Sequence, residues 1–90
     1  MNLLYGVNDS MKIAEEMFFK GYIDEALDLM ADAVNTLQNI NGVNYRYISE
    51  SFGKAKEIYA KFNLDKKAEE MFMEQYKYRK MDLKQIREEK

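Results

Sequence analysis

Apolar residues recur along this chain every three or four positions, in four stretches separated by short polar breaks. That spacing places the apolar side chains on one face of an α-helix. No stretch shows sustained alternation of apolar and polar residues, so no β-sheet is expected. The pattern predicts an all-α fold, a single helical domain over residues 1–90 with helices at about 9–20, 23–40, 44–62 and 64–88.

Glycine and asparagine mark the ends of the predicted helices. Gly21 closes the first helix, because glycine adopts the left-handed conformation without a steric penalty. An Asn-Gly pair at 41–42 ends the second helix, and Asn63 ends the third, since asparagine tolerates that conformation better than most residues. The polar run at 8–10 offers N-cap candidates for the first helix. Nothing stops the fourth helix before the C-terminus, so a long last helix is expected.

The helices are expected to pair and the pairs to stack. A single helical hairpin cannot bury its own apolar face, so two antiparallel hairpins must pack on each other. Ala26 and Ala68 occupy matching positions early in the second helix of each pair, where a close crossing needs a small side chain. Met30 and Phe72, four residues further on, would fill the adjoining space.

Residue types that are missing argue against enzyme chemistry. The chain has no His and no Cys, which removes the commonest general base, nucleophile and transition-metal ligands. Neighbouring carboxylates such as Glu15-Glu16 point about 100° apart on a helix, so they cannot easily converge on one bond. No glycine-rich phosphate loop or Asp-rich calcium loop occurs. We therefore expect no catalysis, no metal site and no cofactor.

The sequence also predicts a cytoplasmic protein. The N-terminus lacks a basic start followed by a long apolar core, so it does not resemble a signal peptide. No run approaches the roughly 18 apolar residues needed to span a bilayer. The absence of cysteine is compatible with a reducing compartment.

Charge is unevenly distributed between the two halves. Residues 1–42 carry two Lys and seven Asp/Glu, a net of −5, whereas residues 43–90 carry twelve Lys/Arg and nine Asp/Glu, a net of +3. Such polarity could steer an acidic partner to the second half or bring two chains together head to tail. The total of −2 argues against nucleic acid as the partner, because nucleic-acid binders present a dominant basic field.

The stretch at 21–27, Gly-Tyr-Ile-Asp-Glu-Ala-Leu, resembles the central turn of the tetratricopeptide repeat family, with Met30 and Ala33 at that family's large and small positions. A looser copy at 63–69 follows 42 positions later, with further matches at Tyr59 and Phe72. This spacing exceeds the usual repeat of about 34 residues and is similar to the extended variant of kinesin light chains and bacterial peptide-sensing regulators. The resemblance covers roughly residues 10–78. An ordinary four-helix bundle is the alternative.

The resemblance implies a binding face. Partner peptides of that family lie along the groove lined by the first helix of each pair. Carried over position by position, this face would comprise Met11, Glu15, Phe18 and Phe19 in the first unit and Glu50, Glu57, Ala60 and Lys61 in the second. Two adjacent aromatic residues cannot both face the same core, so one member of the Phe18-Phe19 pair is expected to be an exposed anchor.

A second candidate patch combines basic and aromatic residues. It consists of Tyr45 and Arg46 in the third helix with Tyr78, Arg79 and Lys80 in the fourth. Such residues could contact phosphates and stack on bases. The other interpretation is that the rings pack internally while the cations reach solvent, and the small positive charge of this half favours it.

The sequence therefore predicts a non-enzymatic protein-interaction module, a small regulator or inhibitor that binds another protein or peptide. A small nucleic-acid-associated protein that uses the basic half is one alternative. A structural dimer that assembles with itself is another. The last helix could fold back as a cap. Alternatively Met81, Leu83 and Ile86, which continue its apolar pattern, could pair with a second chain, and we favour a homodimer through this helix.

Overall fold

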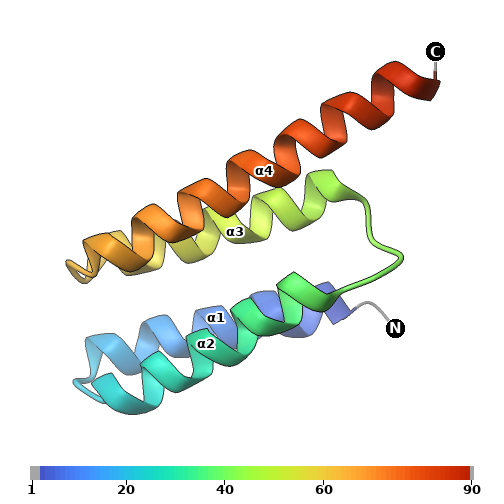
Figure 1. The fold of residues 1–90 in the computed structure, drawn as a ribbon. Coiled ribbons are helices and arrows are strands. Elements are labelled where there is room, and N and C mark those ends of the chain that lie inside the picture. The colour runs from blue at the N-terminus through green and yellow to red at the C-terminus, as the bar shows by residue number, and fades with distance from the viewer. Residues whose placement is uncertain (1–2, 90) are drawn as a thin grey trace.

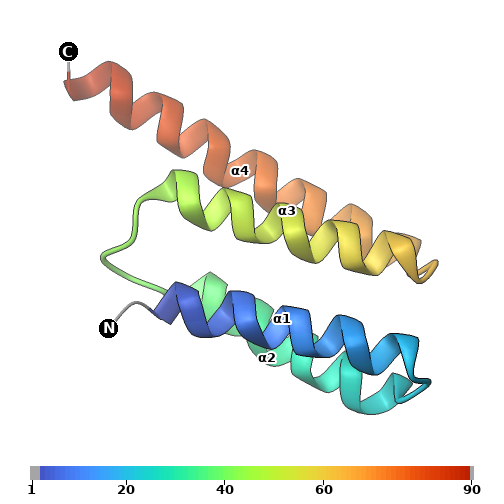
Figure 2. The same ribbon diagram turned by 180° about the vertical axis from the view of Figure 1, so that it is seen from behind.

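Two antiparallel helical hairpins stacked in two layers make up the computed structural model, which describes residues 3–89 (Figures 1 and 2). The helices are α1 (Leu3–Phe19), α2 (Ile23–Asn39), α3 (Tyr45–Lys61) and α4 (Asp65–Glu89). Both hairpin turns lie at one end of the molecule, and the loop that joins α2 to α3 lies at the other. The predicted all-α fold of four helices in two stacked hairpins is confirmed, and no strand occurs in the described range.

Three helices begin and end within one residue of the predicted positions, but α1 begins at Leu3 rather than at residue 9. Leu4 and Val7 are buried and continue the apolar face of the helix toward the N-terminus. The polar run at 8–10 therefore lies inside α1 and does not cap it. Asn8 is accommodated there because its side-chain oxygen accepts a hydrogen bond from the hydroxyl of Ser51 on α3, at 2.9 Å.

The two hairpin turns have the same backbone structure. Gly21 has a φ of 89°, its N–H donates to the carbonyl of Phe18 at 3.1 Å, and the N–H of Tyr22 donates to the carbonyl of Met17 at 2.9 Å. These paired bonds are those of a Schellman C-cap. Asn63, with a φ of 63°, forms the same pair of bonds in the turn at 61–65, with every partner 42 positions further along the chain. The predicted left-handed ends of both first helices are confirmed.

α3 is the central helix of the fold. It contacts α1 and α2 on one side and pairs with α4 on the other. Its buried arc is therefore wide and includes two serines, Ser49 and Ser51, beside its apolar residues. The Ser49 hydroxyl donates to the backbone carbonyl of Gln75 on α4 at 3.1 Å, and Ser51 bonds across to α1. The buried apolar core comprises Leu4, Val7, Met11, Ala14, Phe18, Ala26, Met30, Ala33, Leu37, Ile48, Phe52, Ala55, Ile58, Tyr59, Ala68 and Met71.

α4 is the least covered helix. Within residues 3–89 its only helical neighbour is α3, and its C-terminal end extends beyond the start of α3 (Figure 1). Ala68 and Met71 are buried against α3, whereas Phe72 is half exposed. The prediction that Phe72 fills core space beside Ala68 is wrong, because a helix packed on one neighbour buries only a narrow arc.

No helix in the described part of the chain is both long and apolar enough to cross a membrane.

The positive φ of Gly21 predicts opposite effects for two glycine substitutions. Gly21→Ala should lower the free energy of unfolding by about 1–2 kcal/mol, because an L-residue is strained in the left-handed region. Gly6 lies inside α1 with open space around its Cα, so Gly6→Ala should raise stability by about 0.5–1 kcal/mol. Urea denaturation measures both. Destabilisation by both variants would contradict this assignment.

The close crossing at Ala26 gives a second prediction. Ala26 is fully buried, so Ala26→Leu should lower the free energy of unfolding by about 1–3 kcal/mol through overpacking. Ala31 lies on the exposed face of the same helix, and Ala31→Leu should change stability by less than about 0.5 kcal/mol. Thermal melts of the two variants beside the parent provide the comparison. Equal melting temperatures for the two would refute the packing argument.

Candidate functional site

A groove runs between α1 and α3, the first helices of the two hairpins, and encloses about 470 Å³. We call it the α1–α3 groove. Residues of both helices line it, namely Tyr5, Asn8, Asp9, Met11, Lys12, Glu15, Lys54, Glu57, Ile58 and Lys61. α1 and α3 run in the same direction and contact each other (Figure 1), and the hydroxyl of Ser51 on α3 donates to Asn8 on α1.

The groove combines an apolar floor with charged walls. Met11 and Ile58 are buried and form the floor, and the ring of Tyr5 is exposed at one end. Three lysines and three carboxylates stand around this floor, so the formal charge of the lining is balanced. The groove can therefore take an apolar group between side chains of either sign.

One ion pair stands at the other end of the groove, and a cluster of aromatic rings lies next to it, outside the lining. Nζ of Lys61 lies 2.6 Å from Oε2 of Glu15, which links α3 to α1. Phe62 stacks on the buried ring of Phe18, with centroids 4.8 Å apart, and meets the ring of Phe19 edge to face at 4.9 Å. Phe19 remains 67% exposed, and Lys61 Nζ stands 5.7 Å from its ring centroid. The expectation that one of the two adjacent phenylalanines is exposed is confirmed, and the exposed one is Phe19.

The structure brings several of the predicted partner-binding residues together. Glu15, Glu57 and Lys61 line the groove with accessible side chains, and Phe19 lies at its end. Met11 and Phe18, by contrast, are buried in the core and present almost no surface. They share the face of α1 that packs against the other helices.

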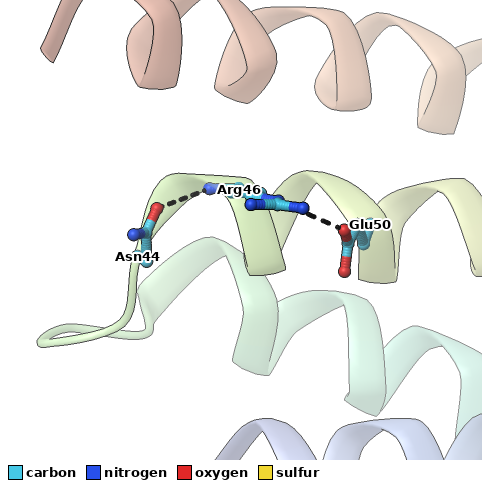
Figure 3. A network of polar contacts seen from close by, with 3 residues as sticks. All are labelled: Asn44, Arg46 and Glu50. Atoms are coloured by element: carbon cyan, nitrogen blue, oxygen red, sulfur yellow. Dashed lines mark hydrogen bonds and ion pairs between the residues drawn. The ribbon is translucent and has the colours of Figure 1, made fainter. Parts of the chain in front are cut away.

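Glu50 lies outside the groove. Its Oε1 is 3.7 Å from Nε of Arg46, one turn earlier on α3, and both side chains are largely exposed (Figure 3). The backbone N–H of Arg46 donates to the side-chain oxygen of Asn44, at 3.0 Å, which caps the start of α3. Arg46 and Glu50, predicted for two different surfaces, are thus partners of each other.

The tyrosines of the predicted basic and aromatic patch pack inward. Tyr78 stacks on the buried ring of Phe52 with centroids 5.5 Å apart, and its ring lies 6.0 Å from that of Tyr45. Both rings are partly buried against the core. Arg79 and Lys80 are exposed further along α4. The patch does not form a continuous stacking platform, because its rings already contact each other and Phe52.

Sequence reasoning missed six residues of the groove lining. Four of them lie on α1: Tyr5 and Asn8 precede residue 9, where the first helix was expected to begin, whereas Asp9 and Lys12 lie within the predicted helix. The other two, Lys54 and Ile58, precede Lys61 on α3 by seven and three positions. Helical spacing counted back from Lys61 places them on the same side of α3 and could have identified them.

Burial and a neighbouring charge alter one tyrosine on α3. Tyr59 is buried, and this burial raises the pKa of its phenol above the ordinary value of 10.0, with the carboxylate of Glu70 adding to the rise. Nζ of Lys67 lies 6.0 Å from the centroid of the ring. Across the described residues, no group of three or more His, Cys, Asp or Glu is placed to hold a metal ion.

Comparison with known proteins yields no match among protein-family models, among curated proteins or among solved structures.

The raised pKa of Tyr59 predicts a loss of stability at high pH. Above pH 10 the unfolded chain releases the phenolic proton while the folded chain retains it, so the free energy of unfolding falls as the pH rises from 10 toward the raised pKa. Tyr59→Phe lacks this proton and should lose less stability over that range. Urea denaturation between pH 7 and pH 11 would measure the difference. Parallel pH profiles for the two proteins would contradict it.

Proposed function

We propose that this chain is a non-enzymatic protein-interaction module whose α1–α3 groove binds an extended peptide segment of a larger protein. The observation that carries the proposal is the groove itself, with an apolar floor, charged walls and the exposed ring of Phe19 at one end. Exposed aromatic residues beside a groove serve as anchors in peptide recognition.

The arrangement of the helices supports this function. α3 packs against both helices of the first hairpin, and the two turns repeat the same hydrogen bonds 42 positions apart. This regularity fits the resemblance to tetratricopeptide repeats, in which partner peptides lie along the first helices of the hairpins. The α1–α3 groove is the corresponding surface of this chain.

The charges that line the groove indicate what kind of peptide it would bind. Lys12, Lys54 and Lys61 share the lining with an equal number of carboxylates, and Lys61 is paired with Glu15 across the groove. This lining lacks the concentrated positive charge that would hold a terminal carboxylate. The proposed ligand is an internal segment with an apolar residue between side chains of opposite charge.

The small size of the groove favours a regulator over a broad adaptor. The two hairpins described over residues 3–89 offer a short binding surface, so a partner of this groove contacts a few residues. We propose a cytoplasmic protein that occupies one segment of a larger protein and thereby activates or inhibits it.

Selection from a displayed random-peptide library against the immobilised chain tests the proposal. Enriched peptides should share an apolar residue flanked by charges. In NMR titrations of the ¹⁵N-labelled chain, their binding should shift the amides around Lys12, Lys54 and Phe19. Phe19→Ala and Lys54→Glu should each weaken binding about tenfold, a loss of about 1.4 kcal/mol.

Ile13 provides the matched control, because it is exposed on α1 but absent from the groove lining. Ile13→Ala should bind the selected peptides as the parent does. Failure to enrich any peptide would refute the groove as the binding surface. Amide shifts confined to Arg79 and Lys80 when random oligonucleotides are added would also refute it.

A further inference from the structure

α4 carries a line of exposed apolar residues that no other helix buries, although Nζ of Lys56 on α3 lies 5.0 Å from the ring centroid of Phe72. Phe72, Tyr76, Leu83 and Ile86 are 48%, 54%, 50% and 45% exposed. With Arg79 they follow one another at intervals of four, three, four and three residues. We call these five residues the α4 stripe.

This spacing is that of a helix that pairs with another helix. Alternating steps of three and four residues give the 3.5-residue repeat of a coiled-coil seam. α3 occupies the neighbouring face of α4, where Ala68 and Met71 are buried. The α4 stripe therefore lies beside the α3 contact, one residue or about 100° further around the helix.

The charges along α4 change sign near its middle. Residues 65–76 contain two Lys and four Asp/Glu, a net of −2, whereas residues 77–88 contain five Lys/Arg and two Asp/Glu, a net of +3. Glu69 lies one turn before the first residue of the α4 stripe, and Arg87 directly follows the last. A helix with this distribution is complementary to a second copy of itself in the opposite direction.

We propose that two copies of this chain form a dimer in which the α4 stripes pack antiparallel. A two-fold axis between Tyr76 and Arg79 would set Phe72 opposite Leu83 of the second copy, and Tyr76 opposite Arg79 of the second copy. A guanidinium over a tyrosine ring is a favourable contact, so the one charged member of the stripe is accommodated. Glu69 would lie next to Arg87 of the second copy.

A parallel arrangement is disfavoured by the same residues. It would place Arg79 against Arg79 and bring the two basic halves together. The antiparallel arrangement is also closed, because each copy uses the same surface and no site remains for a third chain. A single helix pair lies at the lower end of interface sizes, so the dimer should be reversible and concentration-dependent.

The dimer is independent of the proposed peptide binding. The α1–α3 groove is lined by α1 and α3 alone, so α4 can pair while the groove stays open. Loss of one property need not affect the other.

Sedimentation equilibrium of the full chain from about 1 μM to 1 mM tests the dimer. The wild-type mass should rise from 10.7 kDa toward twice that value. Leu83→Glu should weaken association at least tenfold. Ile13→Glu, which places the same charge at a residue of similar exposure on α1, should leave it unchanged. A wild-type monomer throughout, or an undiminished Leu83→Glu dimer, would overturn the proposal.

Charge reversal tests the direction of pairing. Glu69→Arg and Arg87→Glu should each weaken the dimer severalfold, and the double variant should recover the wild-type dissociation constant, because both cross-chain pairs are restored in reversed order. Circular dichroism checks that each variant keeps its helical content. A double variant that associates no better than the single variants would overturn the antiparallel arrangement.

Discussion

The packing of α3 against the first hairpin holds this fold together. Across residues 3–89, the helices of the two hairpins meet only where α3 contacts α1 and α2, and Phe62, directly after α3, stacks on Phe18. Ile48, Phe52 and Ala55 are almost completely removed from solvent, although they belong to a helix in a small, two-layered protein. Such burial requires neighbours on two sides of the helix. The position of every other helix follows from that requirement, because α4 covers one side of α3 and the α1–α2 pair covers the other.

This central role explains the polar atoms in the core. A helix covered on two sides must bury positions at the edges of its apolar face, and on α3 these are serines. Ser51 donates to Asn8, and Ser49 donates to the Gln75 carbonyl, so neither hydroxyl is left without a partner. Ser51 links α3 to α1 through Asn8, a residue of the groove lining, and Ser49 links α3 to α4. The groove thus lies along the same contact that joins the hairpins.

Features that follow from a residue's own conformational preference could be predicted from the sequence. Features that depend on which other helix packs over a residue could not. Gly21 and Asn63 predicted the two turns, because glycine and asparagine adopt the left-handed conformation more readily than other residues. The start of α1 was misplaced, because a polar run that resembles an N-cap is satisfied instead by a partner on another helix. Phe72 was misplaced because its burial depends on a neighbour that α4 lacks. For the candidate site, the exposure of Phe19 followed from its adjacency to Phe18. The lysines that line the groove needed the relative placement of α1 and α3.

The two hairpins share a turn structure but differ in how their outer helices are covered. α2 presents a polar, largely acidic outer face, and its apolar residues lie in or against the core, apart from Ile23 near the turn. α4 has the same position in its hairpin but is longer, and it leaves apolar side chains in solvent beyond its contact with α3. Isolated exposed apolar residues are ordinary, but a regular line of them on one helix is the mark of a contact surface. In this chain that line is the α4 stripe. A second copy would cover the α4 stripe with its own α4 stripe.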